Sequence, residues 1–263
     1  MNGPSGRALV TGAGQRLGRV LAVALAEDGY DVAVHYASSR DGAEDTVREI
    51  AALGRKAIPL GADLLDESET QSLVARASEA LDGPLTVLVN NASIFEPDTL
   101  DSATRESWDR HIGSNLRAPF VLTQTFAAQV PDTGRDANGE PVASGLVVNM
   151  IDQRVLKPTP YFMTYTIAKM GLWAFTRTAA QALAPHIRVN GIGPGPTLRG
   201  VRQSETHFAR QRAATILERG ADPDEVAATL RYFIAAPSVT GQIICVDGGQ
   251  HLAWQTPDVL GPE

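Results

Sequence analysis

Short apolar runs alternate with amphipathic segments along most of this chain, and that alternation constrains the fold more than any other feature. Runs of strand length occur at about 7–11, 31–36, 56–60, 85–90, 145–150, 187–190 and 242–246. Strands of a parallel sheet look like this in a sequence, because helices cover both faces and nearly every side chain is buried. We therefore predict an α/β protein, a single-domain Rossmann fold with a doubly wound, parallel, seven-stranded sheet and helices on both faces.

The segments between these runs carry helix signals. Leucines recur every four residues over 17–25, which gives an apolar stripe able to pack on a sheet. A second stripe runs from Trp108 to Phe120, so we expect Trp108, like Trp173 further along, in the core. Asp222 has the features of an N-cap, since proline and two acidic residues follow it at once.

The chain shows no interdomain linker and no internal repeat. Its 263 residues are near the upper end for one domain, and α/β folds often run 200–250 residues as one unit. We therefore predict one domain over 1–263. The polar segment 131–143, rich in glycine and proline, is predicted to be a surface loop. Residues 194–220 have weak periodicity and follow a strand's carboxyl end, where ligands bind and lids form, so we expect a substrate loop there.

Composition argues against several classes of partner. No apolar run approaches the roughly 20 residues of a membrane span, and the start MNGPSGRALV has no apolar region typical of a signal peptide. The formal net charge of −7 with scattered basic residues argues against nucleic acid. The single cysteine, Cys245, leaves no internal disulfide or cysteine-based metal site and is predicted to be a buried strand residue. We expect a cytoplasmic protein without a metal.

The stretch TGAGQRLG, Thr11–Gly18, joins the first strand to the first helix. Such a turn aims backbone N–H groups and the positive end of a helix at an anion, so it predicts a phosphate site. On their own, Gly12, Gly14 and Gly18 are weak support, because glycines can simply shape a turn. The loop also contains an arginine, Arg16, whose presence needs an explanation.

The end of the second strand predicts which nucleotide the loop binds. The chain reads His35-Tyr36-Ala37-Ser38-Ser39-Arg40 there. An NAD site has an acidic residue at this point to bind the ribose hydroxyls, whereas NADP needs arginine or small polar donors for its extra phosphate. Two hydroxyls and a guanidinium therefore predict NADP(H). The alternative is that Arg40 is an ordinary helix-surface residue paired locally, since Asp41 follows it.

Several motifs in the same order as in a known family extend this prediction. They are ADL at 62–64, NNAS at 90–93, the YxxxK pentapeptide at 165–169 and VDGG at 246–249. With the glycine loop, they make nearly the whole chain resemble the short-chain dehydrogenase/reductase family. That family usually has glycine where this chain has Arg16 and serine where it has Asp152. These departures, with HY after the second strand, NNASxF and NMxD, resemble the pteridine reductase subgroup, which includes bacterial dihydromonapterin reductases.

The resemblance implies a set of site residues. Cofactor contacts are expected from Gly12, Gln15, Arg16, Leu17, Gly18, His35, Tyr36, Ser38, Ser39, Arg40, Asp63, Leu64, Asn91, Ala92, Ser93, Tyr165, Lys169, Pro194, Gly195 and Thr197. Substrate contacts are expected from Arg16, Ser93, Phe95, Asp152 and Tyr165. In this subgroup the arginine of the loop holds cofactor phosphate and faces the pterin, which lies between the aromatic ring and the nicotinamide. Core packing is the alternative for Phe95. The resemblance also implies a homotetramer formed through helix faces and the carboxyl end.

Four residues are predicted to be catalytic: Asp152, Tyr165, Lys169 and Asn115. Tyr165 and Lys169 share one helix face at a spacing of four, and a phenol with a pKa of about 10 needs a cation to lower it. An ionised Asp152 would oppose phenolate formation, so we expect a raised pKa or a proton relay to Tyr165; a cap or a solvated charge is the alternative. By resemblance Asn115 supports the lysine, while its position beside a buried stripe leaves a structural role open.

These residues lead to a functional hypothesis with two alternatives. The first is an NADPH-dependent reductase that transfers hydride to a pterin or dihydropterin, a small-molecule substrate. The second keeps the chemistry but reduces a carbonyl, such as an oxoacyl thioester, a sugar or a quinone, with Asp152 as an unusual replacement for serine. The third is a non-catalytic NADPH sensor, against which the joint presence of Tyr165, Lys169 and Asn115 argues.

Overall fold

A seven-stranded parallel sheet forms the centre of the computed structural model, which describes residues 6–200 and 203–254. Its strands run in the order β3-β2-β1-β4-β7-β8-β9. They are β1 (Gly6–Val10), β2 (Tyr30–Tyr36), β3 (Ala57–Gly61), β4 (Val87–Asn90), β7 (Gly145–Met150), β8 (Ile187–Pro194) and β9 (Ile243–Val246). The order reverses direction between β1 and β4, so the sheet is doubly wound and the predicted fold class is confirmed.

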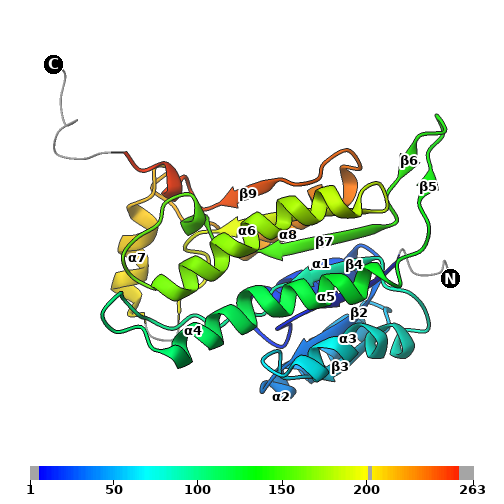
Figure 1. The fold of residues 1–263 in the computed structure, drawn as a ribbon, viewed down its shortest axis with the longest axis horizontal. Coiled ribbons are helices and arrows are strands. Elements are labelled where there is room, and N and C mark those ends of the chain that lie inside the picture. The colour runs from blue at the N-terminus through cyan, green and yellow to red at the C-terminus, as the bar shows by residue number, and fades with distance from the viewer. Residues whose placement is uncertain (1–5, 201–202, 255–263) are drawn as a thin grey trace.

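Helices cover both faces of this sheet (Figure 1). One face is covered by α1 (Arg16–Glu27), α2 (Arg40–Ala52) and α8 (Pro223–Ala235). The other is covered by α3 (Glu67–Ala80), α5 (Ala118–Ala127) and α6 (Met163–Leu183), with α4 (Arg105–Ile112) packed on α6. Leu21 and Leu25 of α1 are fully buried, as their spacing predicts. Asp222 and Glu225 form a capping box at the start of α8, which confirms the predicted N-cap.

The predicted stripe from Trp108 to Phe120 is interrupted. A π-helical turn, η1 (Gly113–Arg117), separates α4 from α5. Its wider i→i+5 hydrogen bonds add a residue to the turn, so positions on either side do not keep the 3.6-residue phase. Trp108 is 42% exposed, and the prediction that it belongs to the core is wrong. Trp173 packs against a small core cluster around Leu172.

The two edges of the sheet carry different structures. The strands end on the left in Figure 1, where α7 (Glu205–Ala213) and two 3-10 turns, η2 (Gln153–Val155) and η3 (Gln250–Leu252), lie. Segment 131–143 is at the opposite edge and forms an exposed hairpin of β5 (Gly134–Arg135) and β6 (Pro141–Val142), which the prediction of a loop missed. Of the predicted substrate loop 194–220, residues 201 and 202 lie outside the described residues.

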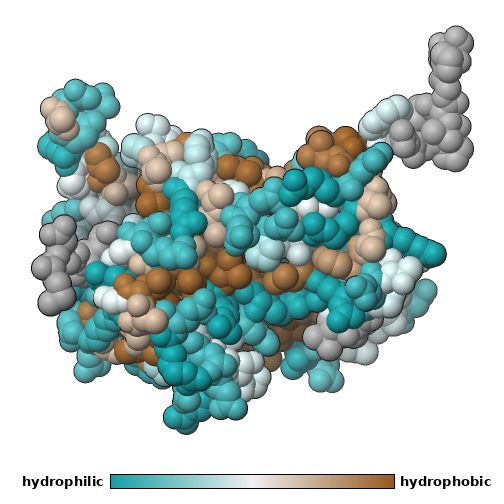
Figure 2. All heavy atoms as spheres, turned by 180° about the vertical axis from the view of Figure 1, so that it is seen from behind, coloured by the Kyte–Doolittle hydropathy of each residue, from teal (hydrophilic) through white to brown (hydrophobic). Residues whose placement is uncertain are grey.

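The surface of the described residues is of mixed polarity. Figure 2 shows the molecule from behind, where a band of apolar groups crosses a largely hydrophilic face. Within residues 6–200 and 203–254, no helix has both the length and the apolar character needed to span a membrane.

Candidate active site

The glycine loop is held at the carboxyl end of β1 by contacts that require glycine. Gly12 has a φ of +62°, in the left-handed region where side chains are disfavoured. A Cβ atom on Gly18 would lie 2.2 Å from the carbonyl oxygen of Gly12. Helix α1 begins directly after the loop, and its N-cap residue Gln15 makes no side-chain capping bond. The first-turn N–H groups of α1 are therefore available to an anion.

Arg16 lies at the start of α1 with a φ of +55°. Its guanidinium donates hydrogen bonds to the carbonyl oxygens of Leu198 (3.2 Å) and Arg199 (2.8 Å). The side chain thus connects the glycine loop to the segment after β8. In the family, glycine is usual at this position, and glycine has no side chain that could make this connection.

His35 lies beneath the glycine loop instead of facing a cofactor. Its Nδ1 accepts a hydrogen bond from the Gly12 N–H (3.0 Å), and its Nε2 is 3.0 Å from the carbonyl oxygen of Ala62. These partners define the tautomer with the proton on Nε2. Burial lowers the pKa of His35 to about 4, so the ring is neutral at pH 7. This corrects the prediction for its side chain: the ring supports the loop.

A cavity of about 340 Å³ lies between the glycine loop and the start of α2. Its lining comprises Gly14, Gln15, Ser38, Ser39, Arg40, Asp41 and Gly42. The Nε of Arg40 donates to Glu44 Oε1 at 2.9 Å, an exposed i,i+4 pair. The local pairing left open by the sequence is therefore present, with Glu44 and not Asp41 as the partner. An exposed pair of this kind is weak, so Arg40 is readily available to a phosphate.

The remaining predicted cofactor residues lie at the carboxyl ends of β3, β4 and β8. Asn91 donates from Nδ2 to the carbonyl oxygens of Thr11 (2.8 Å) and Gly12 (3.2 Å), which fixes the loop against β4. The N–H of Ala92 donates to Thr11 Oγ1 at 2.9 Å. Gly195 bonds to Val246 across the sheet, and the hydroxyl of Thr197 donates to the Gly195 carbonyl at 3.1 Å. Asp63 and Leu64 lie two and three residues after the end of β3.

Tyr165, which is buried, and Asp152, which is half-buried, form a pair at the carboxyl ends of the strands. The Tyr165 hydroxyl is 2.9 Å from Asp152 Oδ2 and donates to it. The other carboxyl oxygen accepts the backbone N–H of Arg154 at 2.8 Å, so Asp152 also caps η2. Burial raises the pKa of Asp152, and burial together with Asp152 raises that of Tyr165 well above its ordinary value. The side chain of Asp152 therefore caps η2, which was one of the two alternatives to a catalytic role. It is not a solvated charge, which was the other.

Lys169 is buried beside Tyr165 and bonded to the end of β7. Its Nζ donates to the carbonyl oxygen of Met150 at 2.7 Å and lies 5.7 Å from the centre of the Tyr165 ring. Burial lowers the pKa of Lys169 to about 8, an effect that Asp152 opposes. The pKa of Tyr165 is raised overall, and the Arg154 guanidinium acts against this rise.

Asn115 holds the loop after β4. It is fully buried in the π-helical turn, a type of distortion common at functional sites. Its Oδ1 accepts the N–H of Ile94 (3.0 Å), and its Nδ2 donates to the carbonyl oxygen of the same residue (2.9 Å). Both ends of the amide are thus bonded to the residue before Phe95, whereas the ammonium of Lys169 bonds to Met150.

Phe95 forms an exposed aromatic wall beside the pair. Its ring is 44% exposed, which rules out the core-packing alternative. It stacks on Phe162 with ring centres 4.2 Å apart and planes 4° from parallel, and it meets the edge of Tyr165 at 4.7 Å. The Ser93 hydroxyl hydrogen-bonds to Tyr165 and acts to lower its pKa. Predicted substrate residues from two segments are therefore in contact.

Two neighbours of the site were missed by the sequence reasoning. Phe162 is one, and an aromatic residue three positions before Tyr165 was the available signal. Arg154 is the other: its guanidinium lies 5.3 Å from the centre of the Phe162 ring and donates to Thr159 Oγ1 at 2.6 Å. No local pattern marked it. Cys245 lies in β9 as predicted, partly buried, and burial raises its pKa to about 12, so the thiol is unreactive.

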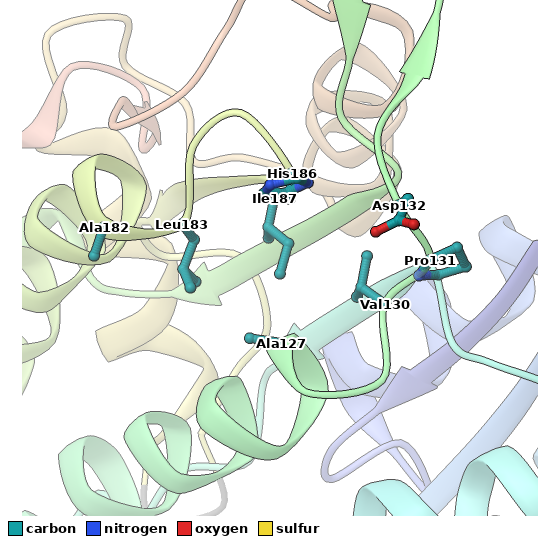
Figure 3. A pocket seen from close by; sticks show the side chains of 8 residues that line it. All are labelled: Ala127, Val130, Pro131, Asp132, Ala182, Leu183, His186 and Ile187. Carbon is teal, nitrogen blue, oxygen red and sulfur yellow. The ribbon is translucent and has the colours of Figure 1, made fainter.

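A second cavity, of about 280 Å³, is separate from these residues (Figure 3). It lies between the ends of α5 and α6 and the start of β8, at the amino edge of the sheet. Tyr165 and Asp152 are at the carboxyl edge, so this cavity takes no part in the candidate site. Among the described residues, no group of three or more His, Cys, Asp or Glu side chains is placed to hold a metal ion.

Comparison with known proteins agrees with this geometry. A family model described as short chain dehydrogenase matches residues 7–209. A 3-oxoacyl-[acyl-carrier-protein] reductase, FabG, of Staphylococcus aureus is 31% identical over 250 residues, covering 93% of this chain and 98% of the relative. The chain therefore belongs to the short-chain dehydrogenase family, as its motifs predict.

Solved structures give further similarities. FolM alternative dihydrofolate reductase 1 from Brucella canis, complexed with NADP, is 43% identical with a TM-score of 0.89, covering 97% of both chains. A short chain dehydrogenase from Burkholderia cenocepacia, also in complex with NADP, is 31% identical with a TM-score of 0.85, covering 95% of this chain and 99% of that one. Both complexes are consistent with the NADP(H) prediction made from the residues after β2.

Proposed function

We propose that this short-chain dehydrogenase is an NADPH-dependent reductase of a pterin or dihydropterin, with Tyr165 as the proton donor. The observation that carries the proposal is the partly buried hydrogen bond between the Tyr165 hydroxyl and the Asp152 carboxyl, at 2.9 Å. Short-chain reductases of carbonyls usually have serine at 152, which supplies a hydrogen bond but no ready proton. The similarity to FolM alternative dihydrofolate reductase supports the same substrate class.

NADP(H) is the cofactor that the chain's own residues fit. The glycine loop leaves no room for a Cβ at Gly18 and presents the open N-terminus of α1 to a pyrophosphate. The cavity of about 340 Å³ has the hydroxyls of Ser38 and Ser39 and the guanidinium of Arg40 for a ribose phosphate. When bound, the cofactor supplies a hydride to the substrate carbon.

The proton reaches the substrate through the buried pair. Reduction of a C=N bond places a hydride on carbon and a proton on nitrogen, so the chain must deliver one proton. The raised pKa of Tyr165 keeps the phenol protonated at neutral pH, as a donor requires. The hydrogen bond between Asp152 and Tyr165 must reverse for this step. As Tyr165 gives its proton to the ring nitrogen, the protonated carboxyl of Asp152, whose pKa burial raises, donates its own proton to the phenol oxygen. Water then restores the proton on Asp152.

Phe95 and Arg16 are proposed to bind the substrate. The exposed face of Phe95 offers a flat apolar surface to a planar ring, and aromatic stacking contributes about 0.5–1.5 kcal/mol beyond area burial. Arg16 is bonded to the carbonyl oxygens of Leu198 and Arg199, which supports a role for segment 194–220 as a loop over the cofactor.

Turnover assays test this proposal. NADPH oxidation by the purified protein is measured with 7,8-dihydropterins, with oxidised pterins, and with a panel of oxoacyl thioesters, sugars and quinones. We expect turnover with a pterin and little with the carbonyls. The opposite result would establish the carbonyl reductase, a candidate favoured by the 31% identity to FabG. Tight NADPH binding without turnover of any compound would favour the sensor.

We also propose a homotetramer. Large apolar side chains remain exposed on α6, at Ile167 and Met170, and near the carboxyl end, at Leu252 and Trp254. Exposed apolar groups that gather on a face often mark contacts between proteins. Light scattering coupled to size-exclusion chromatography measures the mass in solution, and a monomer at micromolar concentration would contradict the proposal.

A further inference from the structure

Three buried polar side chains from different segments meet behind Tyr165, and none of them has a role in the reaction proposed above. Asp98 comes from the loop after β4, His111 from α4 and Thr164 from the first turn of α6. Their exposed fractions are 6%, 0% and 2%. Buried polar groups of this kind need partners, so their hydrogen bonds show what they hold in place.

The hydrogen bonds form one directed chain. The backbone N–H of Glu96 donates to His111 Nε2 at 3.1 Å, so this nitrogen is the acceptor. The proton of the neutral ring is then on Nδ1, which donates to Thr164 Oγ1 at 2.7 Å. The Thr164 hydroxyl in turn donates to the Asp98 carboxylate. Burial lowers the pKa of His111, which agrees with a neutral ring.

The two hydrogen-bond partners of the His111 ring, Glu96 and Thr164, lie next to the two aromatic walls of the candidate site. Glu96 directly follows Phe95, and Thr164 directly precedes Tyr165. The carbonyl oxygen of Asp98 also accepts the N–H of Phe162 at 2.8 Å, where the backbone is left-handed with a φ of +57°. The His111 ring itself lies edge-on to Tyr165, with ring centres 6.0 Å apart. One imidazole therefore connects the loop of the stacking ring with the helix of the proton donor.

We propose that His111 is a positioning residue that holds Phe95 and Tyr165 in register, one through each ring nitrogen. Nε2 fixes the loop that presents the stacking ring, and Nδ1, through Thr164, fixes the turn that presents the phenol. The inference rests on the proposed role of Tyr165 as proton donor but not on the pterin, because any flat or carbonyl substrate would need the same register. Displacement of a reacting group by about 1 Å can cost on the order of 10²-fold in rate.

A matched pair of substitutions separates the two arms. The amide of asparagine lies near the position of Nδ1, and that of glutamine near the position of Nε2. His111→Asn therefore keeps the bond to Thr164 and loses the bond to the Glu96 N–H, whereas His111→Gln does the reverse. We expect His111→Asn mainly to raise KM for the substrate and His111→Gln mainly to lower kcat, each by about tenfold. NADPH affinity should stay unchanged in both.

Further variants control for stability. Thr164→Ser should retain kcat and Thr164→Val should lower it, because only serine keeps the hydroxyl that His111 and Asp98 bind. His186→Gln, at the amino edge of the sheet, is the control for loss of a histidine and should leave both constants unchanged. If His111→Asn and His111→Gln lower thermal stability but leave kcat and KM of the folded enzyme unchanged, His111 is only a core residue and the proposal is overturned.

Crystal structures of the same variants provide a test that does not depend on the substrate. We expect the Phe95 ring to leave its 4.2 Å stack on Phe162 in His111→Asn. In His111→Gln we expect the Tyr165 hydroxyl to move from its 2.9 Å contact with Asp152. Unmoved side chains in both variants would overturn the inference. Failure of the parent protein to reduce pterins would overturn the proposed function alone, since this structural comparison would still stand.

Discussion

Replacement of Asp152 by asparagine is the most direct test of the proton path. The amide oxygen of Asp152→Asn can still accept the Tyr165 hydroxyl at the position where Oδ2 now lies, 2.9 Å away. The amide cannot, however, release a proton to the phenol. The substitution keeps the side-chain volume and the contact with Tyr165 and removes the relay. With its one acceptor oxygen facing Tyr165, the amide also loses the bond from the Arg154 N–H.

The size of the effect follows from the chemistry assigned to the pair. A positioned general acid contributes about 10²–10⁴-fold to a rate. Each factor of ten corresponds to about 1.4 kcal/mol, so the barrier should rise by about 3–5 kcal/mol. The effect should fall on kcat for the pterin, and NADPH binding should change little, because Asp152 lies away from the glycine loop. Since the protonated form of Asp152 is the active one, parental kcat should decline as pH rises through its raised pKa.

Stopped-flow measurement of NADPH oxidation across a pH series checks both points. The decline of kcat at high pH should be present in the parent and absent from the residual activity of Asp152→Asn. Asp152→Ser is the matched comparison, because serine is the residue usual in the family: it should lose pterin turnover to a similar extent while leaving any carbonyl turnover intact. An asparagine variant with kcat within about threefold of the parent, a loss of well under 1.4 kcal/mol, would refute the relay.

Three other outcomes are expected. The pKa of His35 is about 4 in the folded protein and 6.5 in its ordinary state, so the unfolded chain binds more protons between these values and the free energy of unfolding should fall by about 3 kcal/mol from pH 6.5 to 4. Denaturant titrations measure this fall. No difference between the parent and His35→Gln in this range would contradict the prediction. Arg40→Ala should weaken NADPH much more than NADH in fluorescence titrations, and equal losses would mean that Arg40 does not bind the phosphate. The pKa of Lys169 is lowered from 10.5 to about 8, so the unfolded chain again binds more protons between these values and the free energy of unfolding of the parent should rise with pH there by about 3 kcal/mol. Urea unfolding measures this rise. Lys169→Met should abolish both the rise and turnover.

The fold could be predicted largely from the sequence because its signals are local. Strand-length apolar runs, the stripe of leucines on α1 and the cap at Asp222 each depend on residues within a few positions of one another. The alternation of such runs with helical segments was enough to predict a doubly wound parallel sheet. The error at Trp108 arose where local periodicity failed, since the π-helical turn at 113–117 shifts the helix phase and nothing in the residue pattern announces it.

The candidate site was predicted in part for the same reason. The residue types at 152, 165 and 169 follow from the motif spacing, but their electrostatics depend on burial, which no spacing gives. Burial raises the pKa values of Asp152 and Tyr165 and lowers that of Lys169, and the ammonium of Lys169 bonds to the Met150 carbonyl oxygen, a partner that the motif does not indicate.

Contacts between distant segments were decided by the tertiary structure alone. Phe95 meets Phe162 across 67 positions, a separation set by how α6 packs against the loop after β4. Arg16 finds its carbonyl partners at Leu198 and Arg199, 182 and 183 residues away. His111 connects two such segments at once. Sequence by itself determined which residues lie at the carboxyl edge of the sheet, because strand ends are local features; the packing of the helices determined which of them touch.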